Sequence, residues 1–184
     1  MKRRLLILVL IAISAMSGMA LRAAAQTGCD GTSGSATING APWSTPCVVA
    51  ATSPSCVDSL GQDYECFQII GSDSTGTYIA VAIFLAQAPV QGQTYSLGGT
   101  SGHGAMVLGQ AGLWLTGDAP YTGQVHVTVY DPAHSNIECS FSFMARGLFG
   151  SDLTVTSGTF VGRLVGVEQK TWSDVKGLYR DRTR

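Results

Sequence analysis

The sequence predicts a single all-β domain, an antiparallel β-sandwich or flattened barrel of about eight to ten strands. Several segments alternate apolar and polar residues, which is the period of a strand with one buried face. Short polar turns rich in glycine, proline and asparagine separate these segments. Valine and threonine are frequent within them, and β-branched side chains suit a pleated surface. Together these observations favour sheets over helices.

The first 25 residues have the pattern of a secretory signal peptide. A basic start, Met1–Arg4, precedes the apolar run Leu5–Ile13, and the small residues Ala23–Ala25 offer a cleavage site. The mature chain then begins near Gln26 and is exported to the periplasm, the cell surface or the medium. Two alternatives stay open: an uncleaved membrane anchor, or a lipid anchor on Cys29, although Gln26 stands where a lipidation motif prefers leucine.

The mature chain opens with a lead-in, residues 26–34, which we expect to be flexible. The β domain spans residues 35–167 and begins with a strand that ends at Asn39-Gly40, a strong hairpin-turn pair. Trp43 is expected to plug the core. The prolines on either side of it predict an edge strand.

The next strands are expected at 47–51, 64–70 and 77–86. The third of these is apolar on both faces, which predicts a strand in the middle of a sheet and covered on both sides. A buried helix is the rival interpretation, but the β-branched content and the flanking glycines favour the strand. A short strand at 95–97, a glycine-rich loop at 98–104 and a hairpin over 105–116 follow.

The clearest sheet pattern lies between Gly123 and Leu164. Val125, Val127 and Val129 alternate with polar residues, and Asp131-Pro132 ends this strand. The next strand directs one set of side chains inward: Ile137, Cys139, Phe141, Phe143 and Ala145. A further strand follows the loop at 147–150, with Leu153, Val155 and Ser157 on one face and a kink or bulge at Gly158.

These segments carry a family resemblance. Ile38-Asn39-Gly40-Ala41-Pro42-Trp43, the strand Gly92–Leu97, Phe141-Ser142-Phe143-Met144-Ala145 and Ser157-Gly158-Thr159-Phe160 resemble motifs of exported bacterial β-proteins catalogued only as a domain of unknown function. Cys139-Ser140 stands where that family usually has Gly-Thr, and Ser157 where it has Asn. The resemblance implies a β fold and an export route, and it brings no catalytic residues.

Residues 168–184 form a C-terminal tail of different composition, in which Ser173 could cap a short helix. Trp172, Leu178 and Tyr179 are available to dock on the sheet or on a partner. The alternative is a frayed end.

Charge argues against nucleic acid as a partner. Without residues 1–25 the chain keeps 7 of its 11 basic residues and all 12 acidic ones, a net charge near −5. Binding to a phosphate backbone needs a basic surface instead. The mature chain has no transmembrane segment in this interpretation.

Five cysteines lie in the mature chain, and an exported protein is expected to form disulfides. We predict the pairs Cys47–Cys56 and Cys66–Cys139, with Cys29 left unpaired. No Cys-x-x-Cys spacing is present, so we predict no metal site. No cofactor motif is present either.

The sequence has no catalytic constellation. His103, His126 and His134 are its three histidines, and no Gly-x-Ser-x-Gly elbow accompanies them. Asp131 is expected to cap its own turn, and His126 to face solvent. The sequence therefore predicts a non-catalytic binding or structural module of the cell envelope. A lipocalin-like carrier of a small apolar ligand is the alternative, and a hydrolase is less favoured.

Overall fold

The computed structural model describes residues 29–57, 63–84, 88–101, 103–148 and 150–165, without the side chains of 52–57, 63–65 and 84. This part of the chain is all-β, as predicted, and contains eleven strands and no helix. The strands are β1 Ser33–Ile38, β2 Ala41–Thr45, β3 Val48–Val57, β4 Asp63–Ser72, β5 Tyr78–Phe84, β6 Thr94–Leu97, β7 Gly104–Gly109, β8 Gly112–Leu115, β9 Gly123–Asp131, β10 Asn136–Gly147 and β11 Asp152–Leu164. The predicted leader, residues 26–28 and the tail 168–184 lie outside the described residues.

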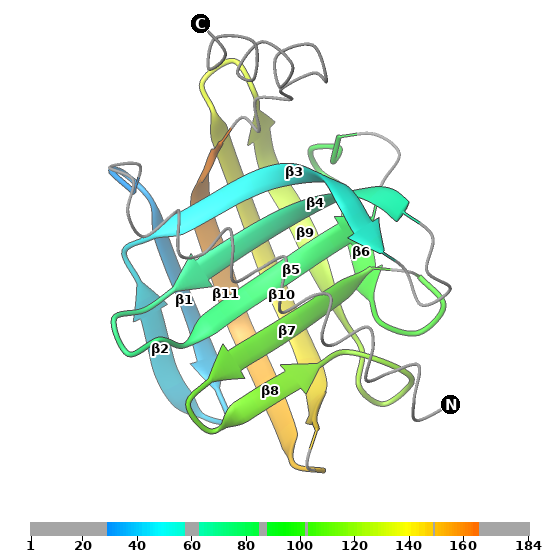
Figure 1. The fold of residues 1–184 in the computed structure, drawn as a ribbon. Helices are drawn as coiled ribbons and strands as arrows, with labels where there is room; N and C mark the ends of the chain where they lie inside the picture. Colours follow the sequence, from blue (N-terminus) through cyan, green and yellow to red (C-terminus); the bar gives the residue numbers. More distant parts are fainter. Residues whose placement is uncertain (1–28, 58–62, 85–87, 102, 149, 166–184) are drawn as a thin grey trace, which may run out of the picture.

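All eleven strands belong to one sheet that folds into two layers (Figure 1). Its order is β2-β1-β11-β3-β4-β5-β7-β8-β10-β9-β6, and an additional pairing of β10 with β11 closes the middle seven strands into a ring. The front layer consists of β3, β4, β5, β7 and β8, and the back layer crosses it at a steep angle. The fold is thus a sandwich whose hydrogen bonding continues around both edges, in effect a flattened barrel.

The two longest strands connect the layers. Strand β10 pairs with β9 as far as Phe143 and then with β8 at Arg146 and Gly147. Strand β11 pairs with β1 and β10, and its last pairs join it to β3, where Arg163 lies opposite Val49. This last pairing is parallel, so the sheet is mixed rather than purely antiparallel as expected.

The core lies between the layers and consists mainly of aliphatic and aromatic side chains. Phe141 packs on Phe160 with ring centroids 4.6 Å apart, and Trp43 meets Phe160 edge-on at 6.3 Å. The largest fully buried side chains are Phe160, Ile69, Ile79, Ile83, Leu97, Ile137, Val48, Val81, Val107, Val125, Val127 and Val155. The strand prediction for β10 is confirmed, since all five expected residues are buried, and that for β9 holds for Val125 and Val127. Val129, expected on the same face, is only half-buried.

Strand β5 lies in the middle of the sheet and has buried apolar side chains on both of its faces, as its sequence predicts. Ile79, Val81 and Ile83 are fully buried in the core, whereas Ala80 points to the other side of the front layer and is also buried. The β1–β2 turn is confirmed as well, because Asn39 and Gly40 both have positive φ, at 48° and 83°.

Two β-bulges interrupt the alternation that the sequence predicts for β9 and β11. Glu138 and Cys139 are consecutive in β10 but lie opposite Val129 and Val127, so one residue of β9 is extra, and Tyr130 turns toward the core. In β11, Ser157 has a φ of 51° and is exposed instead of continuing the inner face of Val155. Beyond it, Gly158 and Phe160 take the inner positions.

The described part of the expected flexible lead-in, residues 29–34, is hydrogen-bonded to the β domain. Strand β1 already begins at Ser33, and the hydroxyl of Thr32 accepts a hydrogen bond from the amide of Val48 at 3.1 Å. The same hydroxyl contacts the carbonyl oxygens of Cys29 and Pro46. Residues 29–34 are therefore held against the beginning of β3.

Candidate functional site

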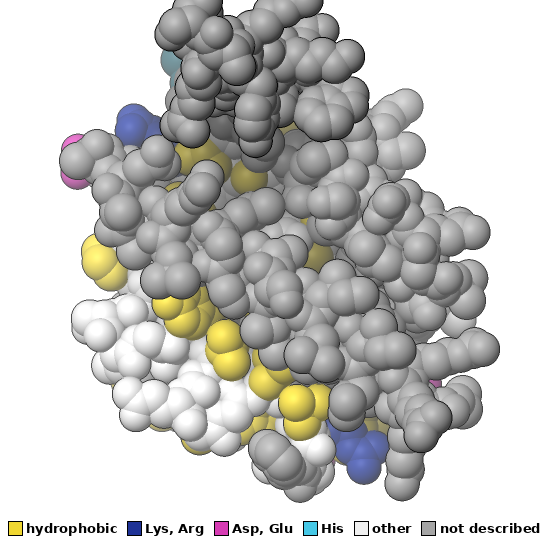
Figure 2. Space-filling view, in the orientation of Figure 1, with side chains coloured by type: hydrophobic (Ala, Val, Ile, Leu, Met, Phe, Trp, Pro, Cys, Tyr) yellow, Lys and Arg dark blue, Asp and Glu magenta, His cyan; other side chains and the backbone are white. Residues whose placement is uncertain are grey.

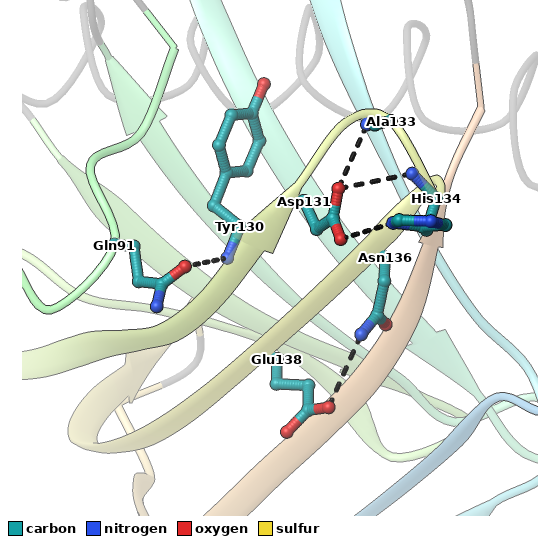
Figure 3. Close-up of polar contacts among 7 residues, drawn as sticks. All are labelled: Gln91, Tyr130, Asp131, Ala133, His134, Asn136 and Glu138. Carbon is teal, nitrogen blue, oxygen red and sulfur yellow. Dashed lines mark hydrogen bonds and ion pairs between the residues drawn. The ribbon is translucent and has the colours of Figure 1, made fainter.

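The most concentrated polar cluster lies at the turn between β9 and β10 (Figure 3). One carboxylate oxygen of Asp131 accepts hydrogen bonds from the amides of Ala133 and His134, at 3.1 and 3.2 Å. The other lies 2.6 Å from Nδ1 of His134. Asp131 therefore caps its own turn, as the Asp-Pro sequence predicts.

The pair is open to solvent, with the His134 side chain 82% exposed and that of Asp131 41% exposed. The hydrogen bond from His134, followed by those of the backbone amides, lowers the pKa of Asp131 below its ordinary value. Tyr130 does not join the pair, since its ring meets Phe67 edge-on at 5.9 Å. A carboxylate and an imidazole thus lie together, but on the surface and without a hydroxyl among their hydrogen-bond partners in Figure 3.

The other two histidines are placed elsewhere. His103 lies in the glycine-rich loop and packs edge-on against Tyr95 at 5.5 Å, and partial burial lowers its pKa. His126 of β9 is half-buried rather than solvated as expected, and its Nδ1 lies 2.9 Å from the hydroxyl of Thr94 on β6. Each histidine therefore has its own separate environment.

No metal centre is formed by the residues that the structure describes, because none of their His, Cys, Asp and Glu side chains gather in groups of three or more. The carboxylate of Asp73, for example, accepts hydrogen bonds within its own turn. Burial disfavours its charge, but hydrogen bonds from Thr75 and Thr77 outweigh this effect and lower its pKa. It caps the β4–β5 turn.

The cysteine pairing differs from the prediction. Cys29, expected to be unpaired, is bonded to Cys47 across a sequence separation of 18 residues. Cys47 is therefore not paired with Cys56. Cys66 is disulfide-bonded as expected, but not to Cys139, which is a free, buried thiol. The side chain of Cys56 lies outside the described residues.

Burial keeps the Cys139 thiol protonated, because desolvation raises its pKa to about 12. A thiol of this kind is a core side chain and not a nucleophile. Near the Cys29–Cys47 bond, the side chain of Thr45 is buried, which no pattern in the sequence predicts. Its hydroxyl accepts a hydrogen bond from the amide of Cys47 at 3.0 Å and contacts the carbonyl oxygen of Ser72, which connects the end of β2 to the turn before β3 and to β4.

A second apolar surface lies on the side of the front layer that faces away from the core. Two adjacent rows of side chains cross the strands in register. They are Val49, Ile70, Ala80, Met106 and Leu115 in one row, and Tyr78, Leu108 and Leu113 in the other. We call these eight residues the outer apolar face. In Figure 2, hydrophobic side chains are visible as a diagonal band at the lower left of the front layer.

Comparisons with known proteins add no relative. No protein-family model matches the chain, and searches of curated proteins and of solved structures give no match either. The described part of the chain contains no helix with the length and apolar character that a membrane crossing requires.

Proposed function

We propose that this chain is an exported, non-catalytic β-module that serves the cell envelope as a binding or structural component. The observation that carries the proposal is that the chain's own aliphatic and aromatic side chains, among them Phe141, Phe143 and Phe160, are buried against one another between the layers. A protein built in this way presents its surfaces, rather than an interior cavity, to its partners.

The packing around Phe160 supports this interpretation. A Cβ atom added at Gly34 or Gly71 would lie 2.8 or 2.7 Å from carbons of the Phe160 ring, and one added at Gly158 would overlap the ring of Phe141. Glycines thus stand where these rings need space. Phe143 and Leu153 are buried beside them.

Export is supported by three independent features. The leader pattern of residues 1–25 is the first, and the resemblance to exported bacterial β-proteins is the second. The third is the Cys29–Cys47 disulfide, together with a disulfide-bonded Cys66, because such bonds persist in oxidising compartments.

A carrier of a small apolar ligand is the second candidate, favoured by the closed ring of seven strands. Lipocalin-like barrels hold ligands inside a ring of this kind. A ligand there would have to displace the packed rings of Phe141, Phe143 and Phe160. This requirement makes the carrier the weaker proposal.

Mass spectrometry of the protein purified from the medium or the envelope fraction tests both. We expect an intact mass that begins near Gln26, without a lipid on Cys29, and a native spectrum free of any co-purified small molecule. Alkylation without reductant should label Cys139 only after denaturation, because its thiol is buried. A retained leader would overturn export, and a stoichiometric lipid or other apolar ligand would favour the carrier.

A further inference from the structure

We propose that the outer apolar face is the docking site of the chain's own C-terminal segment, residues 166–184. The inference goes beyond the proposed function, because it assigns an occupant to a surface that the envelope role does not require. It rests on the character of the face, on where the described chain ends, and on the sequence and charge of the segment.

The outer apolar face is built as an interior surface. Ile70, Ala80, Met106 and Leu113 are only 5–8% exposed although they point away from the core. An antiparallel layer with one solvated face would carry polar side chains there. None of the eleven described strands lies against this face, since the back layer packs on the opposite side.

The described chain ends at the margin of this face. The amide of Val165 donates a hydrogen bond to the carbonyl oxygen of Ala50 at 2.8 Å, next to Val49, where the first row begins. Val165 itself is 40% exposed. The segment that follows Val165 therefore starts beside β3, and the face extends from there across the other four front strands.

The segment has the pattern of an amphipathic helix. Trp172, Val175, Leu178 and Tyr179 follow one another at spacings that place them on one side of an α-helix. A helix over 171–182 would be about 18 Å long at 1.5 Å per residue. Five strands at their usual separation span about 19 Å, so the helix matches the width of the face.

The charge of the segment is opposite to that of the rest of the chain. Residues 26–165 contain two basic and nine acidic side chains, whereas residues 166–184 contain five basic and three acidic ones. The segment is thus attracted to the rest of the chain. If the leader is removed as proposed, Gln26-Thr27-Gly28 remain before Cys29 and offer no large apolar side chain, so the other end of the mature chain cannot cover the face.

Hydrogen exchange of the exported full chain, read by mass spectrometry, tests the inference. We expect amides in 172–180 to exchange roughly tenfold more slowly or better than in a free peptide of residues 166–184. Leu178→Asp and Met106→Asp should each restore the peptide rate, because each places a charge in the contact. Ser140→Asp, an exposed position on β10 in the back layer, is the matched control and should leave the protection unchanged.

Three results would overturn the inference. Amides in 172–180 could exchange at the peptide rate in the unaltered chain, or stay protected in both Asp variants. Their protection could also appear only at concentrations at which the chain dimerises, which would make a second copy the partner. If Met106→Asp unfolds the strands, as exchange of β5 and β10 would reveal, Leu178→Asp decides, because Leu178 lies outside every described strand.

Discussion

The ring of Phe141 on β10 lies 4.6 Å from the ring of Phe160 on β11, measured between centroids, at the centre of the back layer. The contact depends on Gly158, which lies directly opposite Phe141 in the register of the two strands and leaves room for its ring. Phe160 in turn reaches Trp43 on the edge strand β2. One glycine thus allows a chain of aromatic contacts from β10 to the edge of the sheet.

Replacing Gly158 with alanine tests this dependence. The added methyl group would overlap the Phe141 ring, which must move, so we expect the free energy of unfolding to fall by about 1–3 kcal/mol. Urea unfolding followed by tryptophan fluorescence measures the loss. Gly117→Ala is the control, since a Cβ there has no neighbour within 4 Å and should cost less than about 0.5 kcal/mol. Equal stability of the Gly158 and Gly117 variants would contradict the packing argument.

Removing the Cys29–Cys47 disulfide tests what holds the beginning of the β domain. The bond closes a loop with a sequence separation of 18 residues. In the chain-entropy model a loop of this size contributes about 3 kcal/mol, so the double variant Cys29→Ser/Cys47→Ser should lose about that much. Chemical denaturation without reductant gives the value and leaves the bond at Cys66 intact.

Ser44→Ala provides the comparison for this experiment, because Ser44 is an exposed residue of β2 near the disulfide and away from the core. We expect little change in its unfolding midpoint. If the double cysteine variant unfolds at the same denaturant concentration as the unaltered chain, the bond does not stabilise the fold.

The sequence predicts the strands better than it predicts their pairing in three dimensions. Alternation placed Val125 and Phe141 in the core because a two-residue period survives wherever a strand is regular. It misplaced Val129 and Ser157 because a bulge shifts the period by one residue, and neighbouring strands decide where bulges form.

The cysteine pairing and the outer apolar face show the same limit. Cys29 meets Cys47 because Thr32 and the start of β1 bring the lead-in back to β3, a long-range arrangement that cysteine spacing does not encode. The sequence did indicate that β5 is apolar on both faces. Only the register showed that its outer residues continue across β3, β4, β7 and β8 as rows.

The Asp131–His134 turn predicts a small dependence of stability on pH in the acid range. Because the pKa of Asp131 is lower in the folded chain than in the unfolded one, its contribution is fully present above the unfolded value of 3.8. It is lost as the pH falls through the folded value. The difference in unfolding free energy between the unaltered chain and the Asp131→Asn variant should therefore shrink as the pH falls through this range. Urea unfolding at several pH values measures it. Asp118→Asn, at another exposed turn, is the control, and parallel curves for Asp131→Asn and the unaltered chain would contradict the prediction.

His103 predicts a second pH dependence, nearer neutrality. Partial burial lowers the pKa of its imidazole, so the folded chain favours the neutral ring that packs on Tyr95. The unfolded chain takes up a proton at about pH 6.5, before the folded chain does, and stability therefore falls as the pH drops from there to the folded pKa. Below the folded pKa this loss levels off. Titration of the ring proton resonances by NMR, assigned with His126→Gln and His134→Gln, should give His103 a midpoint below about 6.5. A midpoint at or above that value would show that the ring is solvated and not packed in the loop.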